Sequence, residues 1–305
     1  MIDMLRSDDP QVRRHAFVAL RSLTRLSHGF APQLDPQAQP DAIKAWNKWL
    51  ADESARATLH TPIRHFAVPE VGRVLTCLYH QNKVVEYDQA GREVWSVEVH
   101  QPWGCQGLPN GNRLICSYGG SAVIEFDRAG KEIWKLEKLP GNPISVERQN
   151  NGNTLVALSG PNKIIEYRPS GQIAWEVQIE GRPIDARRLE DGRTLVTLDS
   201  DRKVVELDRQ GRVVWSINCD VSPSTAQRLD DDHTLVALRG SGTVVEYDRT
   251  GKVLATIEGF SYPVDAQRMS DGTLLVGDST GVKYLDARGN VLWHKQSGSS
   301  RARKY

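Results

Sequence analysis

Six prolines recur along the chain at a nearly constant interval. They are 40 or 41 residues apart, and each opens a segment like the one from Pro183, PIDARRLEDGRTLVTLDSDRKVVELDRQGRVVWSI. The six are Pro62, Pro102, Pro143, Pro183, Pro223 and Pro263. A period of about forty residues containing several short strands is typical of repeated sheet units that pack on their neighbours. The spacing favours such an architecture over a doubly wound enzyme fold.

Each repeat divides into four short strands separated by tight turns. In the fourth repeat the first strand follows the proline, and Asp191–Gly192 then makes a turn into TLVTL. Asn-Gly and Asp-Gly pairs accept the positive φ that such turns require. A D-x-x-G turn, here Asp208 to Gly211, separates the third strand, KVVELD, from the fourth. Glycine at its end suits the left-handed position of a bulged hairpin.

Four antiparallel strands, repeated six times, predict a mainly β fold, a six-bladed β-propeller of four-stranded antiparallel blades preceded by a short α-helical hairpin. We place the propeller at residues 60–298, with blades starting near residues 62, 102, 143, 183, 223 and 263. Because the repeats run in phase, we expect no strand to be borrowed across the seam of the ring. A permuted blade, or a blade supplied by another chain, is the alternative.

The two ends of the chain differ from the repeats. Residues 1–55 show apolar positions at helical spacing, and Asp9, Pro10, Val12 and Arg13 match the D-P-x-V-R start of a HEAT-like helical hairpin. A single hairpin of this kind needs a partner for its apolar stripe, which makes self-association through these helices possible. Residues 299–305 carry basic side chains, and we expect a flexible basic tail there.

Composition excludes several classes of protein. The 39 basic and 38 acidic residues give a formal charge of +1, so we expect no nucleic-acid partner. No apolar run is long enough to span a membrane, and the start lacks the apolar core of a signal peptide. As given, the chain is expected to be soluble and cytoplasmic, although an exported chain whose leader was trimmed would look the same. The compartment therefore stays unknown.

Cysteine usage does not indicate a disulfide framework. The four cysteines are spread over different repeats and form no C-x-x-C pair: Cys77, Cys105, Cys116 and Cys219. We expect buried free thiols, with a Cys105–Cys116 bridge as the minor alternative.

The repeat motif also carries a family resemblance. The string NGNTLVAL, followed by NKIIEYRPSGQIAWEV, resembles the repeats of pyrroloquinoline-quinone-like propellers and of arylsulfotransferase-type propellers. The resemblance covers about 240 residues. In pyrroloquinoline-quinone propellers, tryptophans at this place dock adjacent blades. The resemblance therefore implies a docking role for Trp95, Trp134, Trp175, Trp215 and Trp293, with Ala255 as the exception.

Two charged sets recur with the repeats. The glutamates of the third strands are Glu86, Glu125, Glu166, Glu206 and Glu246, with Tyr284 in the sixth blade. Arginines late in the first strands are Arg148, Arg188, Arg228 and Arg268. A catalytic acid is normally a single residue in one cleft, so recurrence in every blade indicates a structural role. The sequence leaves open whether the two sets touch.

Residues that break the symmetry are better candidates for function. Loops between blades and loops between second and third strands share one face, where the channel mouth opens. We expect the following candidates on that face: Arg64, His65, Trp103, Arg182, Asp185, Asp199, Arg202, Arg239, Tyr262, Asp265 and Asp278. Asp185 and Asp265 hold the same place two residues after the proline, where a carboxylate pair can hold a hard cation. Trp103 is a candidate stacking platform for a sugar or peptide.

Catalytic signatures are absent from the sequence. There is no GxSxG, HExxH, CxxCH or phosphate loop, and the histidine that arylsulfotransferase-type repeats often place ahead of Asp is replaced by Ile184 and Val264. We expect no cofactor and no metal, and a non-enzymatic scaffold that presents its loop face and channel mouth to a protein, peptide or glycan. The alternatives are a quinone-dependent or sulfuryl-transfer-like enzyme using the channel mouth, and a structural self-assembly module.

Overall fold

A computed structural model of the chain describes residues 1–24, 26–32, 35–59, 73–88, 90–229, 232–298 and 300–305. The chain forms two compact units. The smaller one comprises Met1–Glu70, Arg268–Leu274 and Leu285–Leu292. The larger one comprises Val71–Gln267, Leu275–Tyr284 and Trp293–Tyr305.

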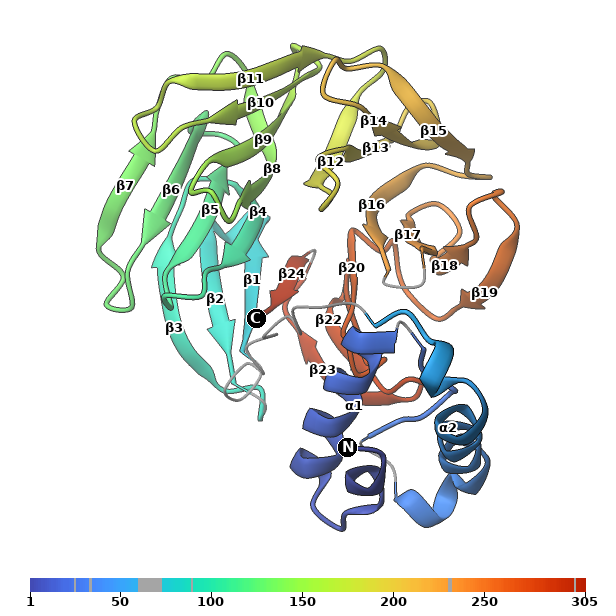
Figure 1. The fold of residues 1–305 in the computed structure, drawn as a ribbon. Coiled ribbons are helices and arrows are strands. Elements are labelled where there is room, and N and C mark those ends of the chain that lie inside the picture. Colours follow the sequence, from blue (N-terminus) through green and yellow to red (C-terminus); the bar gives the residue numbers. More distant parts are fainter. Residues whose placement is uncertain (25, 33–34, 60–72, 89, 230–231, 299) are drawn as a thin grey trace. The chain divides into compact units, whose positions relative to one another are not determined.

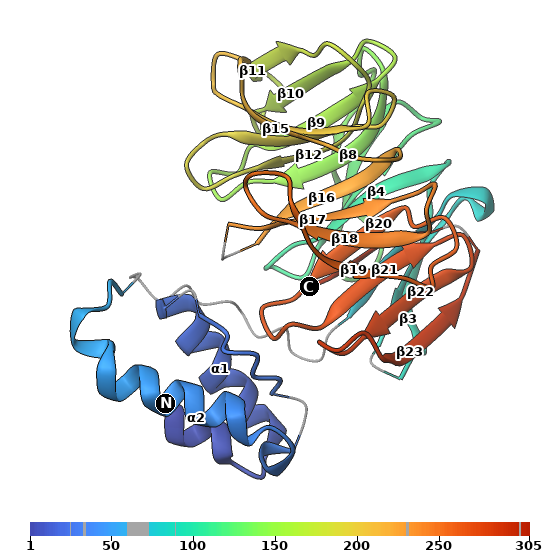
Figure 2. The same ribbon diagram turned by 90° about the vertical axis from the view of Figure 1, so that its right-hand side faces the viewer.

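Two helices form in the N-terminal segment, and they lie side by side (Figure 2). They are α1, Pro10–Thr24, and α2, Pro40–Asp52, and short 3₁₀ turns flank them at η1 Ile2–Arg6, η2 Pro36–Ala38 and η3 Ser54–Arg56. Phe17 and Leu20 of α1 pack with Ile43 and Trp46 of α2 in one hydrophobic cluster. Ile2, Leu5 and Phe30 join the same cluster. The segment therefore buries apolar stripes that we expected to need a partner.

The strands of the chain form a six-bladed β-propeller of four-stranded antiparallel sheets, as the repeat predicted (Figure 1). Blade 1 contains β24 Ser300–Lys304, β1 Val74–Leu78, β2 Lys83–Tyr87 and β3 Glu93–Glu98, with the 3₁₀ turn η4 Tyr79–Gln81 between β1 and β2. Blade 2 contains β4 Pro102–Gly107, β5 Arg113–Ser117, β6 Ala122–Phe126 and β7 Glu132–Leu136. Blade 3 contains β8 Asn142–Arg148, β9 Thr154–Ser159, β10 Lys163–Tyr167 and β11 Ile173–Gln178.

The other three blades continue the same order from the first to the fourth strand. Blade 4 contains β12 Pro183–Arg188, β13 Thr194–Leu198, β14 Lys203–Leu207 and β15 Val213–Asn218. Blade 5 contains β16 Pro223–Arg228, β17 Thr234–Leu238, β18 Thr243–Tyr247 and β19 Val253–Ile257. Blade 6 contains β20 Asp265–Arg268, β21 Leu274–Asp278, β22 Gly281–Leu285 and β23 Val291–Gln296.

The turn residues explain why the strands end where they do. Gly192, in the turn before β13, has a φ of +87°, and Gly211, in the turn between β14 and β15, has a φ of +81°. Only glycine adopts such angles without strain from a Cβ atom. In the same hairpin as Gly211, the register of β14 on β15 shifts between Glu206 and Leu207, as a bulged hairpin requires.

Blade 1 corrects two of our expectations. Its innermost strand is β24, from the opposite end of the chain, which pairs antiparallel with β1 from Val74↔Lys304 to Leu78↔Ser300 (Figure 1). A strand is therefore borrowed across the seam, and residues 300–304 are not a flexible tail. The first strand that we predicted after Pro62 lies outside the described residues. Sheet edges left open expose unpaired backbone groups, which gives the borrowed strand its physical reason.

The seams between blades join the recurrent arginines to the recurrent glutamates. Arg148 of blade 3 donates from Nη2 to Glu125 Oε2 of blade 2 at 2.7 Å. Arg188 and Glu166 repeat this pair at 2.9 Å in the next seam, and Arg228 pairs with Glu206 in the one after. These contacts answer the question that the sequence left open: Arg148, Arg188 and Arg228 each bind the glutamate of the preceding blade.

Three tryptophans of the fourth strands, Trp134, Trp175 and Trp215, lie against the same arginines. The guanidinium carbons of Arg148, Arg188 and Arg228 lie 4.4–4.5 Å from the ring centroids of Trp134, Trp175 and Trp215. Each indole N–H then donates to a carbonyl in the following blade, at Pro169 (2.9 Å), Arg209 (2.7 Å) and Arg249 (2.7 Å). Each of these seams therefore combines an ion pair, a cation–π contact and a hydrogen bond.

Candidate functional site

The structure divides the predicted site residues among several places. Asp199, Arg202, Arg239 and Tyr262 line one pocket on the loop face. Asp185 and Asp265 are fully buried in the channel, where they face arginines instead of solvent. Arg64 and His65 lie outside the described residues.

Two further candidates make local contacts. Arg182 lies 3.6 Å from Asp199 (Nη1 to Oδ2) beside the loop-face pocket. Asp278 is fully buried and accepts hydrogen bonds from Lys283 Nζ (2.8 Å), the Thr280 hydroxyl (2.6 Å) and the Ser261 N–H (3.1 Å). These contacts hold the loop between β21 and β22 and tie it to Ser261 in the link from blade 5.

One position of each innermost strand faces the channel, and we call it the axial position. Arg301 pairs with Cys77 of β1, just as Asp185 pairs with Thr197 of β13, so the register makes these two residues equivalent. From blade 1 to blade 6, the axial residues are Arg301, Gly104, Ser145, Asp185, Thr225 and Asp265. In blade 1 the structure gives the axial position to Arg301, from the C-terminal strand.

The sequence carried a signal for this assignment. The segment SSRARKY aligns with PIDARRL of blade 4, so that Ala302 falls at the place of Ala186 and Tyr305 at that of Leu189. The proline that marks the other repeats is missing, which hides the match. Two pairs of hydrogen bonds agree with this alignment. The side chain of Gln106 bonds the backbone N–H and carbonyl of Arg148 in the next blade, and the side chain of Gln267 does the same with Lys304.

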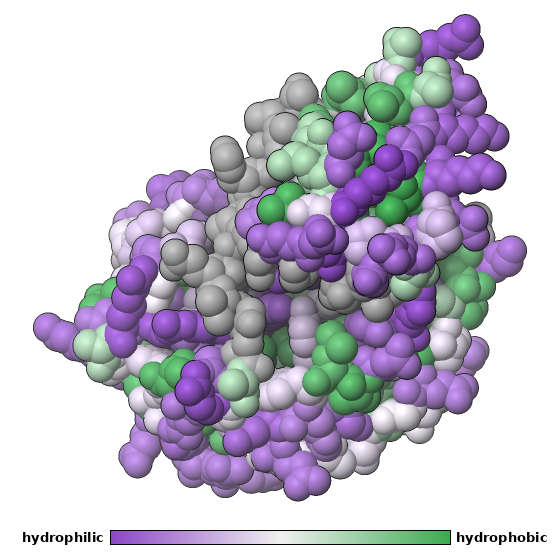
Figure 3. All heavy atoms as spheres, turned by 90° about the horizontal axis from the view of Figure 1, so that it is seen from below, coloured by the Kyte–Doolittle hydropathy of each residue, from purple (hydrophilic) through white to green (hydrophobic). Residues whose placement is uncertain are grey.

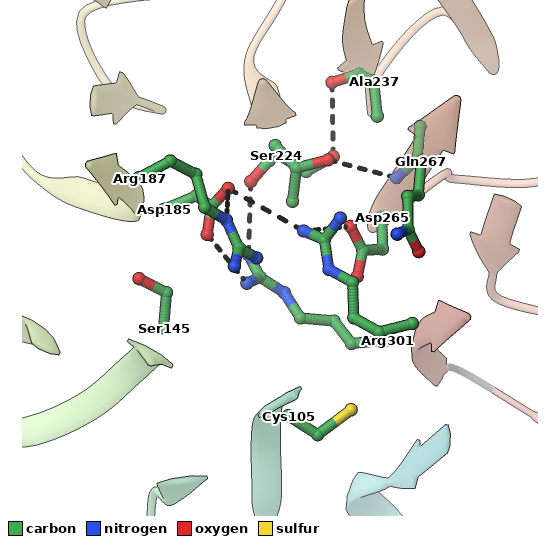
Figure 4. A network of polar contacts seen from close by, with 12 residues as sticks. Cys105, Ser145, Asp185, Arg187, Ser224, Ala237, Asp265, Gln267 and Arg301 are labelled. Carbon is green, nitrogen blue, oxygen red and sulfur yellow. Dashed lines mark hydrogen bonds and ion pairs between the residues drawn. The ribbon is translucent and has the colours of Figure 1, made fainter. Parts of the chain in front are cut away.

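Arg301 lies across the channel and contacts three other blades. Its Nη2 donates to the carbonyl oxygens of Ile184 (3.0 Å) and Ser224 (3.2 Å), and Nη1 donates to that of Ile144 (3.4 Å). Nη1 also lies 3.6 Å from Asp185 Oδ1. Figure 4 shows this network, in which side chains from several blades point toward one another. The guanidinium of one side chain thus ties four blades together.

Arg301 and five other charged groups balance one another in the channel. Arg303 Nη2 lies 2.8 Å from Asp265 Oδ1 and 4.0 Å from Asp185 Oδ2, and Arg187 Nε donates to Asp185 at 3.4 Å. With Glu147, which accepts from the Arg188 N–H at 2.7 Å, the cluster has three acids and three arginines. We call Glu147, Asp185, Arg187, Asp265, Arg301 and Arg303 the channel cluster.

The two axial acids have pKa values shifted in opposite directions. Burial acts to raise the pKa of Asp185, but Arg187, Arg301 and Arg303 outweigh it and hold that pKa below its usual value. Burial raises the pKa of Asp265 above its usual value, because Arg303 and Arg301 offset only part of the desolvation. Asp185 therefore belongs to the better compensated side of the channel cluster.

One small cavity lies beside Arg301. A cavity of about 10 Å³, lined by residues that include Cys77, Tyr79, Trp103 and Arg301, has room for about one water molecule. All four cysteines are free and buried. Burial raises the pKa values of Cys77 and Cys116, so these thiols are protonated and poor nucleophiles.

Trp103 lies in an aromatic cluster near this cavity. Its ring centroid is 5.1 Å from that of Tyr79, edge to face, and 6.0 Å from that of Tyr118. The indole Nε1 is buried and has no hydrogen-bond partner among the residues that the structure describes. The ring is partly buried against its neighbours, so only part of its surface is available for stacking.

The loop-face pocket has a volume of about 490 Å³, and we call it the rim pocket. Asp199 and Arg202 come from the β13–β14 loop, and Arg239 comes from the corresponding loop of blade 5. Links between blades complete it: the β15–β16 link supplies Asp220, Val221 and Ser222, and the β19–β20 link supplies Tyr262. Gly240 is the remaining lining residue.

Arg239 is the unusual group in the rim pocket. Its Nε and Nη2 atoms are buried and have no hydrogen-bond partner within the described part of the chain. Its guanidinium carbon lies 5.5 Å from the ring centroid of Tyr262, a residue that is 54% exposed and has a φ of +57°. A buried donor without a partner costs about 1–3 kcal/mol, and an oxygen ligand that reached these nitrogens would offset that cost.

The other charged residues of the rim pocket are better satisfied. Arg202 donates to the Asp220 carbonyl at 3.3 Å, and Asp199 accepts from the Ser200 hydroxyl at 3.1 Å and lies near Arg182. The described residues contain no group of three or more His, Cys, Asp or Glu side chains arranged to hold a metal ion. The pocket therefore offers one free guanidinium beside an exposed aromatic ring.

The surface as a whole gives little further guidance. Seen from one side it is mainly hydrophilic, with its hydrophobic side chains in separate groups (Figure 3). None of the helices in the described ranges has the length and apolar character to cross a bilayer.

Comparison with known proteins places the chain in a family. The family model described as outer membrane protein assembly factor BamB, a PQQ-repeat family, matches residues 44–190, 119–263 and 168–304. The chain belongs to this family. The overlapping matches extend through β24, in agreement with its role as a repeat strand. None of the curated proteins matches the chain.

Solved structures share the propeller fold at low sequence identity. A protein of unknown function from Bacteroides caccae is 18% identical, with a TM-score of 0.64 over 74% of this chain and 94% of its own. The WD40 β-propeller domain of Doa1 is 14% identical, with a TM-score of 0.59 over 75% of this chain and 80% of its own. A streptogramin B lyase is 12% identical, with a TM-score of 0.56 over 74% of this chain and 81% of its own. At such identities the likeness extends to the fold alone.

Proposed function

We propose that this protein is a non-enzymatic propeller that binds a peptide segment of a protein partner in the rim pocket, through a carboxylate on that segment. The unpartnered guanidinium of Arg239 is the observation that carries the proposal. A carboxylate accepts two parallel N–H bonds from a guanidinium, which matches Nε and Nη2 lying side by side on one edge of the fork.

The surroundings of Arg239 favour a peptide. Arginine and tyrosine are enriched among the residues that dominate binding energy in protein interfaces, and Tyr262 presents an exposed ring next to Arg239. A pocket of about 490 Å³ holds one or two side chains of an extended segment. Asp199 and Asp220 line the same pocket and disfavour a ligand with several negative charges close together.

Several observations favour the loop face over the channel as the binding site. Arg301, at the axial position of blade 1, lies across the channel, and the cavity that described residues line beside it measures about 10 Å³. An enzyme that used the channel mouth, which is the competing hypothesis, needs room for a substrate beside its catalytic groups. The buried thiols there are protonated, and the acids are paired with arginines.

The test uses defined probes. An array carries short peptides with Asp or Glu, their Asn or Gln counterparts, peptides ending as free acids or amides, and neutral glycans. We expect the protein to retain carboxylate-bearing peptides, and Arg239→Ala to weaken them by about 10-fold or more, since hydrogen bonds to charged groups contribute about 1.5–3 kcal/mol. Equal binding by wild type and Arg239→Ala, or a preference for glycans, contradicts the proposal.

Arg212→Ala is the matched control. Arg212 is 75% exposed, pairs with Asp208 in the β14–β15 turn and lies outside the rim pocket. It removes the same charge from the protein, so a general electrostatic effect weakens both variants alike. We expect Arg212→Ala to bind like the wild type.

A further inference from the structure

The innermost strand of blade 1, β24, is held by contacts of its side chains as well as by pairing with β1. We call the edge of β1 together with the side chains that contact β24 the inner seat. We propose that the inner seat is a sequence-selective binding site for an Arg-x-Arg strand followed by an aromatic residue, and that the C-terminal strand of a second copy of this chain can fill it in trans.

Backbone contacts hold the strand from two sides. Five residue pairs join it to β1, from Val74↔Lys304 to Leu78↔Ser300. On the other side, Gln267 of blade 6 accepts from the Lys304 N–H at 2.9 Å and donates to the Lys304 carbonyl at 3.2 Å. These contacts fix the register but involve only the backbone of the strand. Selectivity must therefore come from the side chains of the strand.

Two alternate residues of β24, Arg301 and Arg303, and Tyr305 just after it are each recognised through their side chains. Because side chains alternate along a strand, Arg301, Arg303 and Tyr305 share one face. Arg301 donates to the carbonyls of Ile144, Ile184 and Ser224. Two nitrogens, Nη1 and Nη2, share these contacts, whereas a lysine presents a single ammonium nitrogen, so the first place favours a guanidinium.

The second recognised residue is Arg303, and its recognition is electrostatic. Arg303 lies 2.8 Å from Asp265 and 4.0 Å from Asp185. Without the strand, the channel cluster contains three acids, Glu147, Asp185 and Asp265, against one arginine, Arg187. Three negative and one positive charge leave a formal charge of −2, which the two arginines of the strand neutralise. Uncompensated buried charge is costly, so an empty inner seat attracts such a strand.

The third place is a slot for the aromatic ring. The Tyr305 hydroxyl donates to Glu86 Oε2 at 2.7 Å. A Cβ atom at Gly107 would lie 2.1 Å from the Tyr305 ring, so the absence of a side chain at Gly107 makes the room. The Tyr305 N–H donates to the Arg73 carbonyl at 3.3 Å. The ring therefore has its own site between blades 1 and 2.

None of these contacts depends on the covalent link to blade 6. β23 ends at Gln296 and β24 begins at Ser300, so the strand is joined by residues 297–299. A free strand of the same sequence can make the same contacts. Exchange of an identical element between copies is a common route to dimers, and the inner seat provides the receptor that such an exchange needs.

The test weakens the chain's own strand and supplies another. Arg301→Ala/Arg303→Ala in the full chain lowers the occupancy of its inner seat, and the peptide SSRARKY is added with a fluorescent label. We expect saturable binding and a rise in melting temperature of about 5–10 °C at 100-fold excess over the Kd. SSKAKKY should bind at least about 10-fold more weakly, and SSAAAKY should not bind. Equal shifts with all three peptides, or no shift with any, overturns the proposal.

Two further arms keep the outcome decisive. If the double variant does not fold alone, it is refolded from denaturant with each peptide, and recovery with SSRARKY but not SSAAAKY is the expected result. Equal recovery, or none, counts against the inner seat. For the second copy, the double variant is mixed with Asp185→Asn/Asp265→Asn, whose strand is intact and whose inner seat is impaired. We expect a mixed dimer by light scattering, and its absence overturns exchange between copies.

Discussion

Two arginines in this propeller sit in opposite situations. Arg301, in the channel cluster, is buried and donates to carbonyls of three blades. Arg239, in the rim pocket, is half-buried, and two of its nitrogens have no hydrogen-bond partner in the ranges that the structure describes. Burying a charge requires compensation, and the channel supplies more of it than the rim does. Carbonyl oxygens accept from Nη1 and Nη2 of Arg301, and only its Nε lacks a partner among the described residues, whereas Arg239 lacks partners at both Nε and Nη2. Arg301 therefore helps to close the ring, and Arg239 is the arginine for which we propose a ligand.

The largest effect is expected at Arg301, whose Nη1 and Nη2 atoms donate to carbonyls of three blades. Arg301→Ala removes the contacts across the channel and leaves Asp185 and Asp265 with less positive charge nearby. Removing one partner of a buried pair costs about 3–5 kcal/mol of unfolding free energy. Urea unfolding measures the change, with Arg202→Ala as the control on the exposed loop. A loss below about 1 kcal/mol would break the comparison, because the channel arginine would then be dispensable.

The blade seams are expected to come next. Trp215→Ala removes a ring that lies under Arg228 and Arg249 and donates to the Arg249 carbonyl at 2.7 Å. Because the indole is only partly buried, we expect the low end of the usual range for tryptophan truncation, about 3 kcal/mol. Thermal unfolding measures it, and peptide binding at the rim pocket should persist in the folded protein. An unchanged melting temperature would contradict a role for these tryptophans in docking the blades.

A smaller effect sharpens the comparison within the channel itself. The pKa of Asp185 is lowered in the folded protein, so its contribution is present above the unfolded pKa of about 3.9 and is lost as the pH falls through the folded pKa. The pKa of Asp265 is raised, so its ionised form is a penalty at neutral pH that is relieved as the pH falls through the folded pKa. The two acids therefore have opposite linkage.

Urea unfolding of Asp185→Asn and Asp265→Asn from pH 7 to pH 3 checks these signs. Relative to Asp265→Asn, the wild type should gain stability as the pH falls from 7 toward about 4. Relative to Asp185→Asn, it should lose its advantage below about pH 4. Parallel trends in the two series would show that Asp185 and Asp265 are equivalent, against the difference in their compensation.

The smallest loss of stability is expected at the rim. Arg239→Ala removes a guanidinium that makes no side-chain hydrogen bond in the described part of the protein. We expect the unfolding free energy not to fall, and to rise by up to about 1–3 kcal/mol, because the substitution removes buried donors that have no partner. Circular dichroism melts of wild type and variant measure it. A loss above about 1 kcal/mol would mean that Arg239 holds the fold, and its unpaired nitrogens would no longer argue for a ligand.

The repeat made much of the fold predictable. The strands, the hairpin turns at glycine and the number of blades follow from local patterns, because turn chemistry and alternation act over a few residues. The candidate site was predictable in part. Asp199, Arg202, Arg239 and Tyr262 were expected on the loop face and do line one pocket. Asp185 and Asp265 were expected at the channel mouth as well, but arginines that the sequence places about 40 to 120 residues away cover them.

The sequence by itself determined six units of four strands, since each unit carries its own turns and its own apolar alternation. Only the tertiary structure decided which segment completes blade 1. The segment after Pro62 and the segment SSRARKY both follow the pattern of a first strand, and strand pairing between distant segments leaves no local trace. The choice rests on contacts that exist only in the closed ring: the carbonyls that bind Arg301, the acids that face Arg303 and the space that Gly107 leaves for Tyr305.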